Sequence, residues 1–133
     1  MRWWIGLVLA ALVAVPACKP EPVTVAGTVT YRERMALPAD AVMRIGIEDL
    51  SAPGSPARLL ASTVIKTAGR QVPIPYQITL MDPTTIDPKH EYGLRIRIET
   101  HEGVLLFIND TRYGVLTNGV LKQDVVVKHV AAP

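Results

Sequence analysis

The sequence predicts an all-β domain, an antiparallel β-sandwich of about seven strands. Apolar and polar residues alternate strictly in 43–48 and again in 94–99. This two-residue period is typical of strands that have one buried and one solvated face. Short segments rich in proline, glycine and aspartate separate the apolar runs, as turns do. After residue 17, no segment longer than ten residues has helical spacing, so a sandwich is favoured over a mixed fold.

The predicted strands follow one another along the chain with turns between them. In chain order they are 23–31, 43–48, 59–66, 74–81, 94–99, 104–108 and 120–130. The turns lie at 37–40, 52–56, 82–83, 87–88 and 102–103. Four isoleucines of the second and fifth strands are expected in the core, namely Ile45, Ile47, Ile96 and Ile98. Arg95 and Arg97 fall on the opposite face, which we expect to be solvated.

One corner of the predicted sandwich can be placed more closely. Tyr92 follows Ile86 and Pro88 and precedes Leu94 and Ile96, a spacing that is similar to the tyrosine corner of immunoglobulin-like sandwiches. In that corner the tyrosine hydroxyl bonds to the backbone a few residues upstream. Tyr92 is therefore interpreted as a structural residue. It supports an immunoglobulin-like arrangement of the strands and nothing about function.

The first 17 residues have the layout of a secretory signal peptide. A basic start at Arg2 precedes an uncharged run that ends at Ala17, and the apolar part of this run is too short to span a bilayer. Cys18, the single cysteine of the chain, follows directly, and this arrangement resembles a bacterial lipobox. The resemblance implies that the Cys18 thiol receives a diacylglycerol. The alternative is ordinary signal cleavage after Val15-Pro16-Ala17, which would release a soluble periplasmic domain.

Three regions follow from this interpretation. Residues 1–17 are the lipoprotein signal peptide, 18–22 the acylated cysteine with a proline-rich tether, and 23–133 the β-sandwich domain. Alternating prolines favour an extended, semi-rigid spacer. Lys19 stands where an aspartate would retain a lipoprotein in the inner membrane of enteric-type bacteria. We therefore predict a lipid-anchored protein of the outer membrane that faces the periplasm.

Charge and cysteine content exclude several classes of function. The formal net charge is +2 at pH 7, with 14 basic and 12 acidic side chains, whereas a nucleic-acid binder would show a clustered basic surface. No nucleic-acid partner is expected. With Cys18 acylated, the domain contains no thiol, which excludes a disulfide, a redox pair and a cysteine metal ligand.

Catalytic and ligand-binding motifs are absent from the sequence. His90, His101 and His129 do not pair at metal-ligand spacing, and no nucleophile elbow, zinc-protease motif or phosphate loop occurs. Asp82 and Asp87 adjoin prolines in turns, where aspartate bonds the backbone. We predict a non-enzyme without catalytic residues, cofactor or metal. The alternative is an envelope enzyme acting on glycan or peptidoglycan, because paired carboxylates can meet in space without a sequence signal.

Several blocks of the sequence resemble the YbaY/YscW family of bacterial lipoproteins. The most distinctive is 27–42, which reads GTVTYRERMALPADAV, and 72–76, 86–92 and 105–117 agree in order. The resemblance implies a small outer-membrane lipoprotein with a β-sandwich domain. In the YscW branch it implies a pilotin, a chaperone that escorts the secretin of a type III secretion system to the outer membrane. The sequence is similar above all to the YbaY branch.

We therefore expect a monomeric binding module for an envelope or secretin-type protein, docking an extended or helical segment of it. Arg34, Met35 and Leu37 are the weak candidates for partner contact. They combine a basic head with two apolar side chains in one loop, a mixture found at interface hot spots. The alternative is that Leu37 and Pro38 only seal the end of the sandwich.

Overall fold

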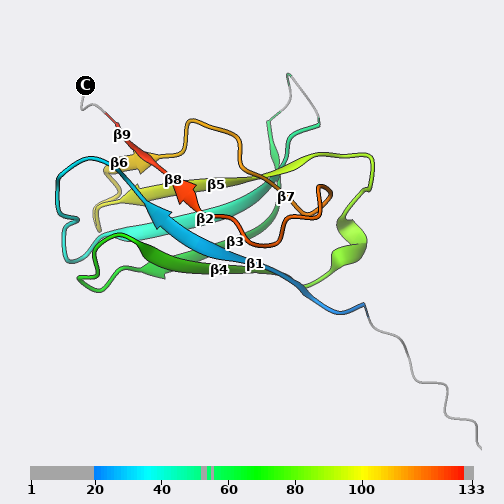
Figure 1. Ribbon diagram of the computed structural model, residues 1–133, viewed down its shortest axis with the longest axis horizontal. Helices are drawn as coiled ribbons and strands as arrows, with labels where there is room; N and C mark the ends of the chain where they lie inside the picture. The colour runs from blue at the N-terminus through cyan, green and yellow to red at the C-terminus, as the bar shows by residue number, and fades with distance from the viewer. Residues whose placement is uncertain (1–19, 52–53, 55, 131–133) are drawn as a thin grey trace, which may run out of the picture.

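Two β-sheets pack against each other with the apolar core between them, as the computed structural model shows for residues 20–51, 54 and 56–130 (Figure 1). The all-β sandwich predicted from the sequence is confirmed. The predicted signal peptide and Cys18 lie outside the described residues, as does most of the turn at 52–56. Among the described residues, no helix is long and apolar enough to cross a bilayer.

The smaller sheet has three strands and the larger has six. In the smaller sheet, β1 (Val23–Thr30) lies between β4 (Ile74–Leu80), which is antiparallel to it, and β8 (Val125–Val126), which is parallel to it. The larger sheet is antiparallel throughout. Its strand order is β3 (Arg58–Lys66), β2 (Val42–Asp49), β5 (Tyr92–Glu99), β6 (Leu105–Ile108) and β9 (Lys128–His129), and β7 (Gly114–Val115) also pairs with β5. A short 3-10 helix, η1 (Pro83–Thr85), precedes β5.

The predicted alternation of faces is confirmed in β2 and β5. Ile45 lies opposite Ile96, and both side chains are almost fully buried, as are Ile47 and Ile98. Arg95 and Arg97 alternate with them on the exposed face. Burying an isoleucine side chain contributes about 1.5–3 kcal/mol, so these cross-strand rows are a main source of stability.

The end of the chain differs from the prediction of one strand over 120–130. Ala26 N donates to Leu121 O at 3.0 Å, and Val127 N donates to Thr30 O at 2.8 Å, so the segment runs parallel to β1. It then changes sheets, and Val130 N donates to Leu106 O at 2.9 Å. The predicted strand is therefore replaced by β8 and β9. Because β8 joins β1 in parallel, the sandwich is not purely antiparallel.

A glycine permits this close approach of the two chain segments. A Cβ atom on Gly27 would lie 1.9 Å from the carbonyl oxygen of Gln123, too close for any other residue unless the backbone moves. The same Gln123 oxygen accepts a hydrogen bond of 2.6 Å from the Tyr76 hydroxyl of β4. The pKa of Tyr76 is raised to about 12, because burial disfavours its charged form.

A short strand that the sequence analysis did not predict, β7, shares one edge of β5 with β6. Between them the side chain of Asn109 takes the place of a strand backbone. Its Oδ1 accepts from Ile96 N at 2.8 Å, and its Nδ2 donates to Leu94 O at 2.9 Å. Nine strands are thus present in the described residues, against about seven predicted.

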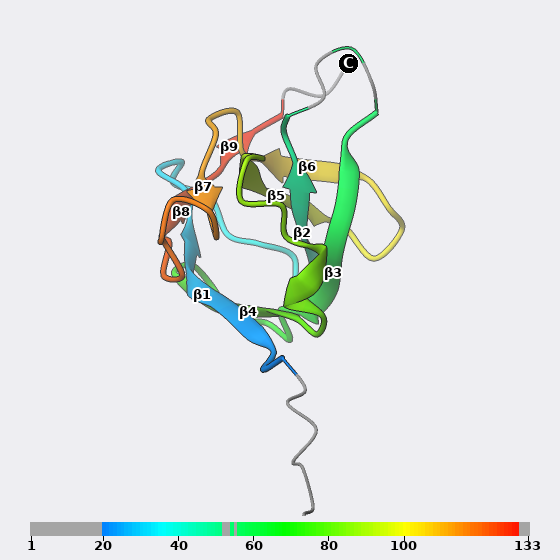
Figure 2. The same ribbon diagram turned by 90° about the vertical axis from the view of Figure 1, so that its right-hand side faces the viewer.

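The sandwich has two ends, which we name by their distance from the start of β1. The proximal end holds the start of β1, the loop between β2 and β3, the loop 81–91 with η1, and the loop 116–124; Figure 2 views this end (Figures 1 and 2). The distal end holds the loops 31–41, 67–73 and 100–104. Val23, the first residue of β1, therefore lies at the proximal end, whereas Arg34 lies in the loop 31–41 at the distal end.

Candidate functional site

The structure separates the three residues predicted to contact a partner. Leu37 is 5% exposed and belongs to the core. Its N–H donates to Gln71 Oε1 at 2.8 Å, and its carbonyl accepts from Gln71 Nε2 at 3.2 Å. Met35 is 44% exposed and Arg34 is also exposed. Leu37 thus closes the distal end, as the alternative interpretation proposed, whereas a contact role for Arg34 and Met35 stays a prediction.

Aromatic packing holds this distal loop in place. The Tyr31 ring stacks on Phe107 at 4.1 Å, and Phe107 meets His129 edge-on at 5.3 Å. The Tyr31 hydroxyl donates to Met35 O at 2.6 Å. Hydrogen bonds from backbone N–H groups, including that of His129, lower the pKa of Glu33. The loop is therefore tied to β6 and β9, and Met35 projects from a fixed backbone.

Three arginines line the outer face of the larger sheet, which we call the arginine face. Arg44 Nε lies 3.1 Å from Glu99 Oε2, Arg97 Nε lies 3.3 Å from Glu99 Oε1, and Arg95 Nε lies 2.9 Å from Glu48 Oε1. Both glutamates are nearly buried, whereas all three arginine side chains are about half exposed. In each pair the contact is made through Nε, and the half-exposed guanidinium group keeps an exposed part that can bind a further carboxylate.

A shallow, mainly apolar groove of about 210 Å³ runs between the arginine face and β3. Leu59 and Val64 of β3 line it and are 51% and 53% exposed. Gly46 forms part of its floor, because a side chain there would meet Leu59 at 3.1 Å. β3 is an edge strand of the larger sheet, so its free backbone groups adjoin the groove. The sequence analysis placed Arg95 and Arg97, which also line the groove, on a solvated face and did not predict the groove.

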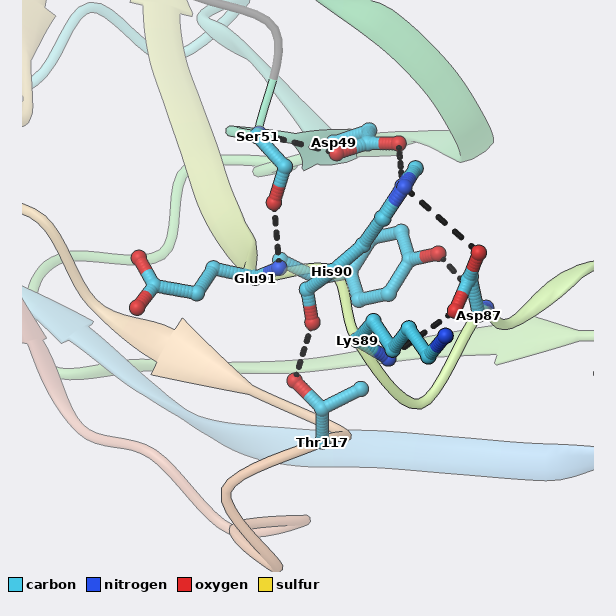
Figure 3. Close-up of polar contacts among 8 residues, drawn as sticks. Asp49, Ser51, Asp87, Lys89, His90, Glu91 and Thr117 are labelled. Atoms are coloured by element: carbon cyan, nitrogen blue, oxygen red, sulfur yellow. Dashed lines mark hydrogen bonds and ion pairs between the residues drawn. The ribbon is translucent and has the colours of Figure 1, made fainter.

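A polar cluster at the proximal end joins β2 to the loop before β5 (Figure 3). His90 Nδ1 lies 2.7 Å from Asp49 Oδ2, and His90 Nε2 lies 3.5 Å from Asp87 Oδ2. The Thr117 hydroxyl donates to His90 O at 2.8 Å. Two hydrogen bonds lower the pKa of Asp49. The larger effect comes from the bond that Ser51 N donates, and the smaller from the bond with the His90 side chain. The cluster borders a cleft of about 600 Å³.

The predicted tyrosine corner forms part of this cluster. The Tyr92 hydroxyl accepts from Asp87 N at 2.8 Å, five residues upstream, which confirms the predicted geometry. Asp87 Oδ1 accepts from Lys89 N at 2.9 Å, so this aspartate bonds the backbone as expected. The Ser51 hydroxyl oxygen accepts from Glu91 N at 2.6 Å rather than contacting His90. Serine and histidine therefore form no nucleophile–base pair here.

The polar cluster has no metal-binding geometry. Among the residues that the structure describes, no group of three or more histidine, cysteine, aspartate or glutamate side chains is arranged to hold a metal ion. Its hydrogen bonds instead join loops to strands.

Comparison with known proteins identifies the family to which the chain belongs. A family model described as "Type III secretion system lipoprotein chaperone (YscW)" matches residues 20–127. The chain belongs to this YscW family, and the resemblance found in the sequence is confirmed.

Two relatives extend this result. The Uncharacterized lipoprotein YbaY of Escherichia coli (strain K12) is 33% identical over 112 residues, which cover 82% of this chain and 58% of that protein. The chain thus spans less than two thirds of the length of this relative. A solved structure of an alternative pilotin from the type II secretion system of Vibrio cholerae is 34% identical, with a TM-score of 0.79 over 84% of this chain and all of that one.

Membership of this family confirms the prediction of a non-enzymatic, chaperone-like lipoprotein. The matched family is described as a chaperone family and the matched structure as a pilotin, so the alternative of a glycan-cleaving enzyme is set aside. The surfaces that matter are therefore those that can hold another protein.

Proposed function

We propose that this protein is a lipid-anchored chaperone of the outer membrane that faces the periplasm and binds a secretin-type envelope protein. The observation that carries the proposal is the match to the whole chain of a pilotin at a TM-score of 0.79. Residues 1–17 are the signal peptide, Cys18 carries the lipid, and 23–133 form the binding domain, which acts as a monomer.

The anchor can be tested directly, because Cys18 is the single cysteine of the chain. Two or more acyl chains give stable membrane anchoring, whereas one gives only marginal binding. Metabolic labelling with a fatty-acid probe should label the protein, and Cys18→Ala should abolish the label. A mature protein without label, free in the periplasm, would instead support ordinary signal cleavage. Fractionation of the two membranes tests the outer-membrane location.

The docking surface that we propose is the groove beside β3. Its occupant is an amphipathic segment of the partner that carries both apolar side chains and carboxylates. Leu59 and Val64 offer apolar contact, and the exposed guanidinium groups of the arginine face can form charge-assisted hydrogen bonds with carboxylates. The free edge of β3 adds backbone groups that can pair with an extended segment.

Point variants can assign the docking surface. Val64→Asp and Arg97→Glu should weaken capture of the secretin by the detergent-extracted lipoprotein about tenfold or more, a loss of about 1.4 kcal/mol each. Met35→Asp and Arg34→Glu are the matched controls, because both residues are exposed at the distal end. The amount of secretin multimers in the outer membrane should likewise be lower with the two groove variants than with the two control variants.

The opposite result assigns docking to the distal loop. If Met35→Asp and Arg34→Glu lose the secretin while the groove variants retain it, the loop that contains Arg34, Met35 and Leu37 is the binding site. If all four variants retain it, neither surface is the site. If the unaltered protein captures no secretin, the proposed partner is wrong. Size-exclusion chromatography with light scattering tests the monomeric state.

A further inference from the structure

An apolar hollow of about 390 Å³ lies at the proximal end, separate from the groove beside β3. Three segments that are distant in the sequence build it: the start of β1, the loop before β5 and the loop after β7. Its apolar lining residues are Val23, Ile86, Pro88, Leu116 and Leu121. Leu121 is 46% exposed at its rim. Val23 pairs with Leu80, the last residue of β4, and Met81 follows directly. The Met81 side chain is 71% exposed.

The backbone of the loop after β7 holds one of these residues in an unfavourable conformation. Leu116 has φ +69°, in the left-handed region that favours glycine. The turn is closed by bonds from Leu116 N to Val120 O at 3.0 Å and from Gly119 N to Leu116 O at 2.9 Å. Glycine would adopt this conformation without strain, but the chain has a leucine here. The Leu116 side chain lines the hollow and also packs on the core.

The length of the tether limits where this hollow can lie. Cys18 precedes Val23 by five residues, and five extended residues span at most about 18 Å. In polyproline geometry, which the prolines favour, the span is about 16 Å. β1 then leads away from the hollow, and its eight residues extend for about 26 Å toward the distal end. With Cys18 acylated, the hollow is the part of the domain that can least move away from the membrane.

Both positively and negatively charged side chains lie around the hollow, and neither sign predominates. Lys89 and Lys122 adjoin two of its apolar residues in the sequence, and neither forms an ion pair within the described part of the chain. Glu21 and Glu91 are exposed carboxylates of the same end. A contact made here must therefore rest on burial of apolar surface rather than on net charge.

We infer that the proximal hollow rests on the phospholipid surface in which the protein is anchored, with Leu121 and Met81 entering the interface. This inference rests on the lipid anchor of the proposed function. Because the anchor makes the contact intramolecular, even a small apolar area is enough to orient the domain. The distal end then points away from the bilayer, and the arginine face lies along the side of the domain, open to a partner.

Site-specific fluorescence tests the contact on the full acylated protein. The chain's single cysteine carries the lipid, so Leu121→Cys adds one free thiol for an environment-sensitive fluorophore. Met35→Cys is the matched control, because Met35 is 44% exposed at the distal end and Leu121 is 46% exposed at the proximal end. On vesicles of phosphatidylethanolamine and phosphatidylglycerol, the label at position 121 should shift to shorter wavelength and be quenched by nitroxide-labelled lipid. The label at position 35 should do neither.

Each alternative result contradicts the inference in its own way. Equal water exposure of both labels on the vesicles means that the hollow does not touch lipid. A label at position 121 that is shielded only after a secretin is added assigns the hollow to a protein partner. If a label at position 121 disturbs the loop, the same measurement is made with Lys122→Cys. The mass of the protein separates the two proposals: no acyl chains on Cys18 contradicts the anchor itself, whereas an acylated protein with a water-exposed position 121 contradicts only the lipid contact.

Discussion

The two ends of the sandwich are closed by different means. At the distal end, Leu37 enters the core and Tyr31 stacks on Phe107, so apolar side chains fill the space. At the proximal end, hydrogen bonds around His90 and Tyr92 hold the loops together but leave hollows of about 600 and 390 Å³. Apolar packing therefore closes the distal end, whereas the proximal end retains two cavities, one of which has an apolar lining.

Leu37→Ala should give the largest effect of the changes that test this difference. Shortening a buried leucine costs about 2–5 kcal/mol, because contacts are lost and a cavity is left. Leu121→Ala at the proximal end should change the free energy of unfolding by about 0.5 kcal/mol or less, since that side chain is half exposed. Urea unfolding followed by circular dichroism measures both. Equal losses would mean that the proximal leucine is packed as tightly as the distal one.

Tyr31→Phe and Tyr92→Phe compare one hydroxyl at each end. Each change removes one hydrogen bond to the backbone and should cost about 0.5–1.5 kcal/mol. The two changes differ in which backbone group loses its hydrogen-bond partner. Tyr31 donates to a carbonyl, whereas Tyr92 accepts from Asp87 N, so only Tyr92→Phe frees an amide. Hydrogen exchange at Asp87 should therefore become faster in Tyr92→Phe alone, and unchanged exchange would show that this corner does not protect the amide.

The smallest effect concerns acid sensitivity. Hydrogen bonds from Ser51 N and His90 hold the pKa of Asp49 below its ordinary value of 3.8. The folded state therefore gains stability from this carboxylate above pH 3.8, and loses it as the pH falls through the lower folded pKa. Asp49→Asn should reduce this acid-dependent part of the stability at the proximal end.

Glu33→Gln provides the matched change at the distal end, because backbone hydrogen bonds lower the pKa of Glu33 in the same direction. Nuclear magnetic resonance titration of the two carboxyl groups follows each end separately. An Asp49 carboxyl that titrates at or above 3.8 would mean that its bonds to Ser51 and His90 do not persist in solution.

The parts of the fold that the sequence predicts are those encoded by local alternation. β2 and β5 each carry a run of isoleucines at every second position, so their buried faces are recognisable without any knowledge of partners. The last segment has no such pattern, because three valines follow one another in 125–127 while the chain changes sheets. The close approach at Gly27 depends on Gln123, near the other end of the chain, and leaves no local signal.

The candidate site divides in the same way. Sequence blocks identify the family, and Leu37 is recognisable as a possible seal of the sandwich. The arginine face needs the register of two strands, because only pairing places Arg44 opposite Arg97. An arginine and a glutamate on the same face of each strand are the signal that could have indicated it. The contact of His90 with Asp49 joins residues 41 positions apart and has no such signal.

The crossing of the last segment between the sheets also sets the order in which the domain can be completed. Among the residues that the structure describes, one edge of β1 is covered by 121–127 alone, and the far edge of β6 by 128–130 alone. Pairings of such long sequence separation form slowly and late. β1 therefore keeps one edge unpaired until residues 121–127 reach it, so the smaller sheet can be completed only after most of the domain is available.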